Sequence, residues 1–175
     1  MSPHAVASPF APALLGLRAL TELTRRYAAE VRAGRHRVVV DPEQRWYNLL
    51  RSDDAVDVWL ITWSTEQFAE LHDHGDSLGA LTVVRGGLTE DRWVPGRHAL
   101  AGRRIGAGRS VGFGRGYVHE VSNPDAQAAV SVHAYSPPLT RMSYYAPDAR
   151  SDGAGSVLRR TRTVVTGPGR PEGVG

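Results

Sequence analysis

The sequence predicts an all-β domain preceded by a helical segment, and two patterns carry this prediction. From residue 37 onward, short runs rich in β-branched and aromatic residues are punctuated by Gly, Pro, Asn and Asp, which is typical of strands joined by turns. Many such strands at close spacing indicate a sandwich or a barrel. Before them, apolar residues recur at three- and four-residue steps over residues 13–33, which predicts one amphipathic helix.

These elements divide the chain into three expected parts. Residues 1–36 form a helical extension whose helix ends near Gly34, because glycine often terminates helices. Residues 37–165 form the β domain, and its first β-rich run is Arg-Val-Val-Val at 37–40. Residues 166–175 are rich in Gly and Pro, and we expect them to be disordered.

The composition of the 175-residue chain excludes several kinds of chemistry. Its apolar fraction of 41% and charged fraction of 22% are ordinary for one globular domain. The chain has no cysteine, which excludes disulfides, thiolate metal sites and a cysteine nucleophile. Any metal must therefore be held by His, Asp or Glu, and any oxidation of a thiol must act on a ligand.

Charge and hydropathy limit the expected partners. The net charge is only +3 and the arginines are spread along the chain, so we expect no nucleic-acid binding. No apolar run approaches the roughly 20 residues that span a bilayer, and no basic segment precedes the apolar stretch near the N-terminus. We expect a cytoplasmic monomer without membrane contact that acts on a small molecule.

Two histidines suggest a metal site. His72 and His74 lie two residues apart in the run Leu-His-Asp-His-Gly-Asp-Ser, and alternate residues of a strand face the same side. A His-x-His pair alone is a weak signal, since both rings could simply decorate a strand. His119 lies in a later β-rich run and could supply a third ligand.

The spacing around these histidines resembles the two motifs of the cupin superfamily, which implies a small jelly-roll β-barrel. The first motif has His-x-His, then Glu, then Gly, and here it falls on His72, His74, Gly79 and Gly86, with Gly79 in the place of the Glu. The second motif has Gly, Pro, Gly, His and Asn, and here it falls on Gly108, Gly114 (in place of Pro), Gly116, His119 and Asn123. A barrel that keeps these histidines without a metal is the alternative.

The absence of a glutamate at Gly79 changes the expected chemistry. Most cupins bind their metal with three His and one Glu, whereas three neutral imidazoles leave the full charge of a divalent ion and about three open positions. Such a site suits an anionic, chelating substrate together with dioxygen. Imidazole ligands suit Fe, Cu, Ni and Zn alike, so the ligand type does not select the metal.

The sequence resembles one cupin branch with three His ligands, the thiol dioxygenases, and chiefly cysteine dioxygenase. The runs His-Asp-His-Gly-Asp-Ser and Ser-Val-His-Ala-Tyr-Ser-Pro-Pro are similar to segments of that family, and Trp63 also fits its pattern. The resemblance implies Fe(II) held by His72, His74 and His119. It also implies a hydrogen-bonded triad beside the iron, here Ser131, His133 and Tyr135; the alternative is a polar cluster that only supports the core.

The chain departs from this family at two places. Animal members have a cysteine that crosslinks to the active-site tyrosine, but Gly79 occupies that place, as in many bacterial members, so Tyr135 cannot carry the crosslink. The family also has an arginine two residues after a tyrosine, which pairs with the substrate carboxylate.

That tyrosine corresponds to Tyr47 here, but Leu49 stands two places later. By the parity of a strand, Arg45 and Arg51 face the same side, and either could clamp a carboxylate with two parallel hydrogen bonds. Surface positions for both arginines are an equal alternative.

The reaction implied by the resemblance adds both atoms of O2 to the sulfur of L-cysteine and gives cysteine sulfinic acid. A dioxygenase for 3-mercaptopropionate or another small thiol acid is the nearest alternative, because the expected arginine is displaced. A non-catalytic cupin that binds a metal or ligand, and a zinc or nickel cupin with hydrolytic or isomerase chemistry, are alternatives of other classes.

Overall fold

A computed structural model describes residues 13–151 and 153–165 of the chain. The expected tail at 166–175 lies outside these residues. After the helix α1 (Leu17–Arg32), the fold consists of strands and one short 3-10 turn, Pro95–Arg97. The strands are β1 (Tyr47–Ser52), β2 (Asp57–Trp63), β3 (Phe68–Asp73), β4 (Leu78–Arg85), β5 (Gly87–Val94), β6 (Ala99–Gly106), β7 (Ser110–Phe113), β8 (His119–Ser122), β9 (Ala129–Ser136), β10 (Arg141–Ala149) and β11 (Ser156–Val165).

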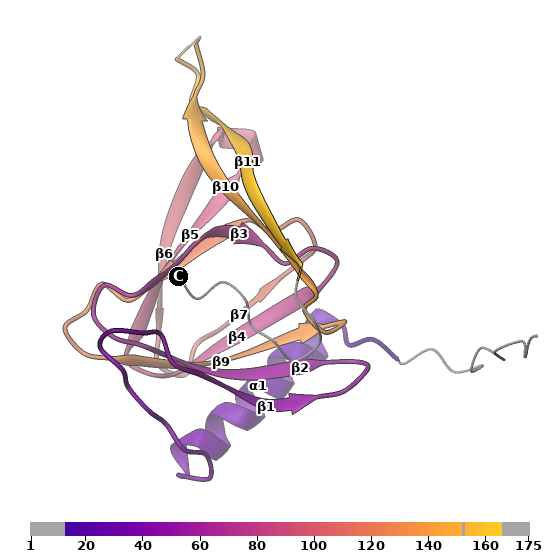
Figure 1. Ribbon diagram of the computed structural model, residues 1–175, viewed down its shortest axis with the longest axis vertical. Coiled ribbons are helices and arrows are strands. Elements are labelled where there is room, and N and C mark those ends of the chain that lie inside the picture. Colours follow the sequence, from indigo (N-terminus) through magenta and orange to yellow (C-terminus); the bar gives the residue numbers. More distant parts are fainter. Residues whose placement is uncertain (1–12, 152, 166–175) are drawn as a thin grey trace, which may run out of the picture.

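The strands form two antiparallel sheets that face each other (Figure 1). One sheet has five strands in the order β1-β2-β9-β4-β7, and the other has six in the order β11-β10-β3-β8-β5-β6. Neighbours such as β4 and β9 are far apart in sequence, so chain segments cross between the sheets as in a jelly roll. The structure confirms the expected all-β, jelly-roll architecture. The hairpin of β10 and β11 forms one edge of the six-stranded sheet and reaches the upper part of Figure 1.

Helix α1 covers the outer face of the five-stranded sheet (Figure 1). Its buried face presents Leu20, Thr24, Ala28 and Val31 at the three- and four-residue steps that the sequence predicts. The helix is shorter than the expected 13–33, and Gly34 follows it with a positive φ of 72°, a conformation that glycine adopts without strain. Because α1 covers this sheet, β9 is buried at every residue.

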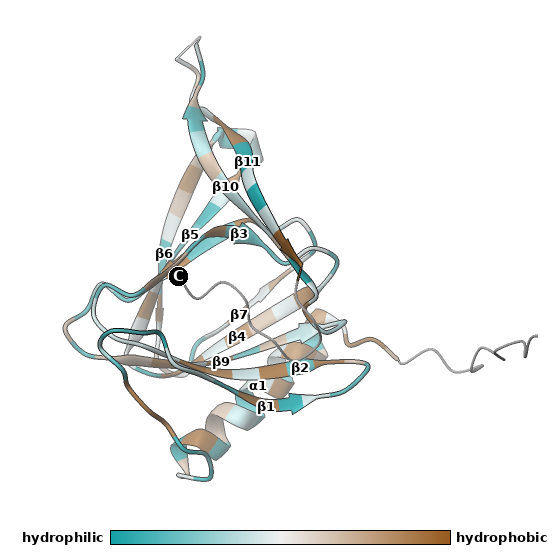
Figure 2. Ribbon diagram, viewed as in Figure 1, coloured by the Kyte–Doolittle hydropathy of each residue, from teal (hydrophilic) through white to brown (hydrophobic). Residues whose placement is uncertain are grey.

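Two hydrophobic cores result from this layering. One core lies between α1 and the five-stranded sheet, and Figure 2 shows hydrophobic segments on α1 and along β2 where these elements meet. The other lies between the two sheets and contains Trp63, Phe113 and Tyr135. The inter-sheet core is therefore the place where side chains from both sheets meet away from water.

The β-rich run at 37–40 does not form a strand. Val38 instead packs against the core beneath α1, and the Thr62 hydroxyl donates a hydrogen bond to the Val39 carbonyl at 2.8 Å. The hydrogen bond from Thr62 and the packing of Val38 therefore hold this run in place. The run lies outside the five-stranded sheet, whose edge strand is β1. By contrast, the last ten residues of the expected β domain form β11, which pairs along its length with β10.

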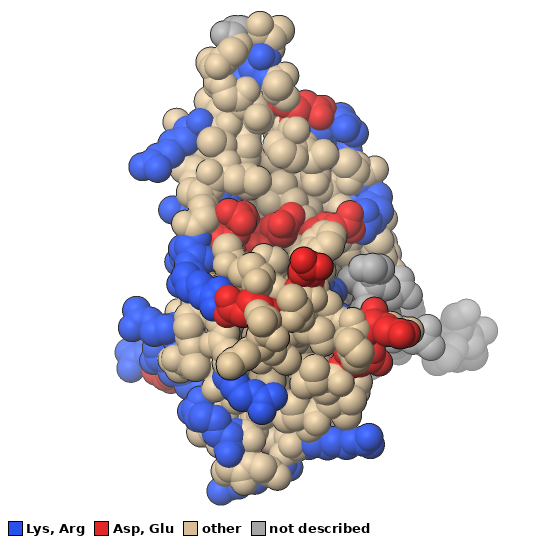
Figure 3. All heavy atoms as spheres, turned by 90° about the vertical axis from the view of Figure 1, so that its left-hand side faces the viewer, with Lys and Arg blue, Asp and Glu red and all other residues tan. Residues whose placement is uncertain are grey.

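The outer surface carries mixed charges. Figure 3 shows basic side chains scattered over one face, with acidic side chains in a band across its middle. In the part of the chain that the structure describes, no helix has the length and apolar character needed to cross a bilayer.

Candidate metal centre and its surroundings

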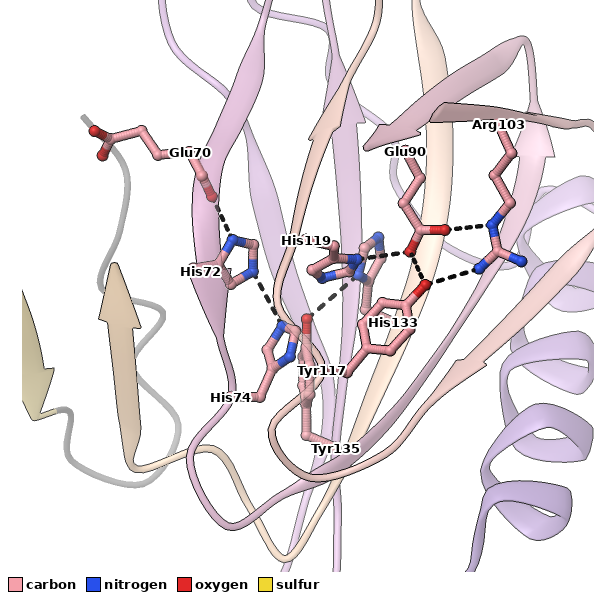
Figure 4. A network of polar contacts seen from close by, with 9 residues as sticks. All are labelled: Glu70, His72, His74, Glu90, Arg103, Tyr117, His119, His133 and Tyr135. Carbon is pink, nitrogen blue, oxygen red and sulfur yellow. Dashed lines mark hydrogen bonds and ion pairs between the residues drawn. The ribbon is translucent and has the colours of Figure 1, made fainter. Parts of the chain in front are cut away.

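Three buried histidines converge between the sheets (Figure 4). His72 belongs to β3, His74 follows that strand, and His119 begins β8 directly opposite His72 in the strand register. One ring nitrogen of each histidine lies within 4.8 Å of the others, and the two Nε2 atoms of His72 and His74 are 3.1 Å apart. The structure therefore brings together the three ligands that the sequence motifs predict.

Local irregularity in β3 aims the first histidine inward. The register of β3 against β8 shifts between Ala69 and His72, which marks a bulge. Phe68 and Glu70 share the parity of His72 but are exposed, whereas His72 is buried, so the bulge separates them. Bulges often re-aim side chains next to functional sites, and this one lets the Glu70 carbonyl accept a hydrogen bond from His72 Nδ1 at 2.5 Å.

Asp73 holds the turn that carries the second histidine. One carboxylate oxygen accepts hydrogen bonds from the backbone N–H of Gly75 at 2.9 Å and of Ser143 at 3.3 Å. The other oxygen accepts one from the Tyr145 hydroxyl at 2.6 Å. These contacts tie the end of β3 to β10 and thereby position His74 beside His72.

The donor set fits a metal ion. Burial, followed by the charge of His119, lowers the pKa of His72 to about 3, and burial lowers the pKa of His74 well below its usual value. Both rings are therefore neutral near pH 7, the form that binds metals. Imidazole nitrogens lie about 2.1 Å from a bound ion such as zinc, so two ligands near a right angle are about 3 Å apart, as the Nε2 atoms of His72 and His74 are.

The three histidine rings differ in the hydrogen-bond partner of their Nδ1 atoms. His72 donates to a backbone carbonyl, and His119 Nδ1 lies 2.7 Å from the Glu90 carboxylate. Among the described residues, His74 Nδ1 is buried and has no hydrogen-bond partner. Two of the three ligands thus present a defined Nε2 to the centre of the site.

Glu90 is a functional candidate that the motif analysis missed. Its side chain is fully buried in β5, where one carboxylate oxygen meets His119 and the other accepts a hydrogen bond from Arg103 Nε at 2.5 Å. Burial acts to raise the pKa of Glu90, but the hydrogen bonds from His119 and Arg103 outweigh it and lower the pKa. A glutamate two residues after the buried Leu88 occupies an inward-facing strand position, and this pattern is the signal that could have revealed it.

The predicted triad lies along β9 on the opposite sheet. The Ser131 hydroxyl is 2.9 Å from His133 Nε2, and His133 Nδ1 is 3.3 Å from the Tyr135 hydroxyl. Trp63 Nε1 donates to the Ser131 hydroxyl at 2.9 Å. Burial, followed by the charges of His119 and Arg45, lowers the pKa of His133 to about 3, and burial raises the pKa of Tyr135.

The triad and the histidine cluster lie side by side between the sheets. The rings of His74 and Tyr135 lie 5.0 Å apart between their centroids. The Phe113 ring packs against two of the histidine rings, with its centroid 4.8 Å from that of His74 and 5.0 Å from that of His119. It also fills the space beside Gly79, where an added Cβ would lie 1.9 Å from Phe113 Cε2.

The structure separates the two candidate arginines. Arg45 precedes β1, stacks its guanidinium 4.9 Å from the Trp63 ring and donates to the Phe68 carbonyl at 2.7 Å. Its charge contributes to the lowered pKa values of His72 and His133, which places it near the site.

Arg51 instead forms a half-exposed ion pair with Asp53 at 2.7 Å. The expectation that Arg45 and Arg51 face the same side by parity is wrong. Arg45 lies before β1 begins, and a register shift between Leu49 and Arg51 interrupts the alternation within the strand.

Tyr47 lies in β1, close to the Arg45 guanidinium. Burial lowers the pKa of Arg45, and the nearby phenols of Tyr144, Tyr135 and Tyr47 act against this effect. The Tyr47 ring packs on the inter-sheet core, with its centroid 6.0 Å from that of Trp59. Arg45 and Tyr47 therefore lie together, in the reverse order of the tyrosine–arginine pair expected from the resemblance.

Comparisons with known proteins agree with this site and fold. The family profile described as "Cysteine dioxygenase type I" matches residues 7–148, which is most of the chain. A crystal structure of the protein TT1209 from Thermus thermophilus is similar, with a TM-score of 0.51 and 16% identity over 57% of this chain and 90% of that one.

Two further structures have similar folds. A Klebsiella pneumoniae protein with a double-stranded β-helix domain matches with a TM-score of 0.50 and 16% identity, over 57% of this chain and 78% of that one. A recombinant oxalate oxidase in complex with glycolate matches with a TM-score of 0.50 and 17% identity, over 59% of this chain and 56% of that one. At these identities the similarity establishes the fold alone.

Proposed function

Because this chain belongs to the cysteine dioxygenase type I family, we propose that it is an iron-dependent thiol dioxygenase that converts L-cysteine to cysteine sulfinic acid. The observation that carries the proposal is that three buried histidines and a Ser-His-Tyr triad lie side by side between the same two sheets. His72, His74 and His119 would hold Fe(II). Iron bound there supplies the redox chemistry that joins both atoms of O2 to the substrate sulfur.

The triad orients the Tyr135 hydroxyl toward the reacting groups. The Trp63 N–H can only donate, so Ser131 accepts from it and its own O–H is available for His133 Nε2. His133 is neutral, and in this arrangement its Nδ1–H donates to the Tyr135 oxygen. The Tyr135 proton is then available to the substrate or to oxygen, and its raised pKa keeps the phenol protonated near pH 7.

Arg45 is the better anchor for the substrate carboxylate. Its charge acts on Tyr135 and on His72, which belong to the two halves of the site. Stacking on Trp63 and the bond to the Phe68 carbonyl limit its motion, which reduces the entropy lost when a carboxylate binds. Arg51 instead forms a half-exposed ion pair with Asp53.

The position of Arg45 also supports a second candidate substrate. Arg45 precedes Tyr47, whereas the family pattern has the arginine after the tyrosine, so the carboxylate anchor approaches from a different point of the chain. A thiol acid without an amine, such as 3-mercaptopropionate, could therefore be preferred. Because the chain has no cysteine, Tyr135 would act without a cysteine–tyrosine crosslink.

Oxygen uptake by the Fe(II)-loaded protein tests the proposal. We expect uptake with L-cysteine, little uptake with Zn(II) or Ni(II) in place of iron, and a sulfinic acid product by mass spectrometry. Faster turnover of 3-mercaptopropionate at saturation would assign the second substrate. Protein that binds iron but consumes no O2 with either thiol would contradict the proposal and favour a non-catalytic metal-binding cupin.

A further inference from the structure

We infer that Glu90 is a positioning residue of the metal site: its buried carboxylate, clamped by Arg103, orients His119 and strengthens it as a ligand. The inference rests on the proposed function only in that His72, His74 and His119 bind a divalent metal. It concerns how the chain compensates for the absence of a carboxylate ligand at Gly79.

The contacts define one arrangement of the His119 ring. Glu90 is fully buried, and its Oε1 lies 2.7 Å from His119 Nδ1, a length typical of a charge-assisted hydrogen bond. A carboxylate can only accept here, so Nδ1 carries the proton and Nε2 is directed toward His72 and His74 (Figure 4).

Arg103 holds the other side of the carboxylate. Its Nε donates to Glu90 Oε2 at 2.5 Å, and a terminal nitrogen donates to the Tyr117 hydroxyl at 3.1 Å. That hydroxyl donates in turn to Glu90 Oε1 at 3.3 Å. Glu90 therefore has three donors around it and cannot rotate away from His119 without losing them. The Arg103 side chain is 44% exposed, so the contacts from Arg103 through Glu90 to His119 connect the surface with the buried histidine.

The arrangement has an electronic consequence. A carboxylate that accepts the Nδ1 proton of an imidazole increases the basicity of the opposite nitrogen, and a buried location strengthens this interaction. Most cupins place an anionic oxygen on the metal, but here Phe113 occupies the space beside Gly79. The negative charge of Glu90 would instead act on the metal indirectly, through the hydrogen bond between its carboxylate and His119.

Binding of Co(II) to the metal-free protein is the principal test, because it needs no turnover. Glu90→Gln keeps the shape and removes the charge, and we expect the Co(II) dissociation constant to rise about 10- to 100-fold. Glu120→Gln is the matched control, since Glu120 follows His119 directly but is only partly buried in β8 and interacts with Asp91 and Glu70. We expect that variant to bind Co(II) like the wild type. Equal affinity of Glu90→Gln and wild type would overturn the inference.

Arg103→Gln provides a second variant in case Glu90→Gln does not fold. It removes the donor that clamps Glu90 Oε2 but keeps the carboxylate beside His119, so we expect the Co(II) dissociation constant to rise, though less than in Glu90→Gln. Wild-type affinity in this variant would contradict the clamping role of Arg103. Equal loss of affinity in both variants would contradict the inference, because it would mean that the cluster only supports the strands.

A proton NMR spectrum of the Zn(II) form gives an independent readout. We expect a downfield Nδ1–H signal of His119 that moves upfield in Glu90→Gln, and an unchanged position would also overturn the inference. Failure of the oxygen-uptake experiment, by contrast, would leave these binding results standing.

Discussion

The two facing sheets contribute different parts of the site, and they hold them differently. The six-stranded sheet supplies His72 and His119, which are supported by a carbonyl and by a carboxylate from neighbouring residues. The five-stranded sheet supplies the triad from one strand, β9, which is buried along its length beneath α1. Under the proposed function, the six-stranded sheet would be the metal-binding wall and the five-stranded sheet the wall that places substrate and protons, so mutations should separate these two properties.

The largest effect is expected on the metal-binding wall. His119→Ala removes one of the three proposed ligands and one of the three donors around the buried Glu90, so we expect loss of stoichiometric iron and of activity. Iron content after gel filtration and oxygen uptake measure the two losses. A variant that retains iron and turnover would show that His119 is not a ligand.

The opposite wall should affect turnover while sparing the metal. Tyr135→Phe removes only the hydroxyl that His133 positions, and we expect kcat to fall about 100-fold, as for the loss of one oriented donor. Iron content should stay at the wild-type level. Equal losses of iron and activity would mean that the two walls are not separable.

A smaller effect is expected where the carboxylate binds. Arg45→Met should raise KM for L-cysteine about 10- to 100-fold, the range for losing hydrogen bonds to a charged group. Arg51→Met is the matched control, because Arg51, near the end of β1, forms a half-exposed ion pair with Asp53 just after that strand. A larger change in KM for the Arg51 variant would reverse the assignment of the two arginines.

The smallest expected effect concerns the close contact between Gly79 and the Phe113 ring on the five-stranded sheet. Gly79→Cys would place a Cβ against the Phe113 ring, and forcing extra atoms into a packed core costs about 1–3 kcal/mol. Chemical denaturation should show this loss, and Gly79→Cys should cost less stability in a Phe113→Ala background than in the wild type, as a double-mutant cycle would measure. Full stability of the single variant would show that Phe113 does not confine the position.

The sequence predicts the two walls with different completeness. The β-rich runs predict the all-β class, and the resemblance carried by the histidine motifs and by the run from Ser131 to Tyr135 implies the jelly roll and the members of the site. Glu90 escapes such reasoning because it meets His119 only through the pairing of β5 with β8. Arg45 and Arg51 escape it because irregular backbone breaks strand parity, which sequence alone does not reveal.

The run at 37–40 illustrates the same limit in the fold. Its valines have the composition of a strand, but β1 already forms the edge of the five-stranded sheet and Val38 packs beneath α1 instead. Propensity describes which residues suit a strand, while the partner that would complete the hydrogen bonding depends on the whole topology.

Turnover under ¹⁸O₂ tests the central claim most directly. If the histidine cluster and the triad together form a thiol dioxygenase, the Fe(II) protein incubated with L-cysteine will yield cysteine sulfinic acid in which both sulfur-bound oxygen atoms are labelled. Product with one labelled atom, or oxygen consumption that yields only the disulfide, would contradict the account.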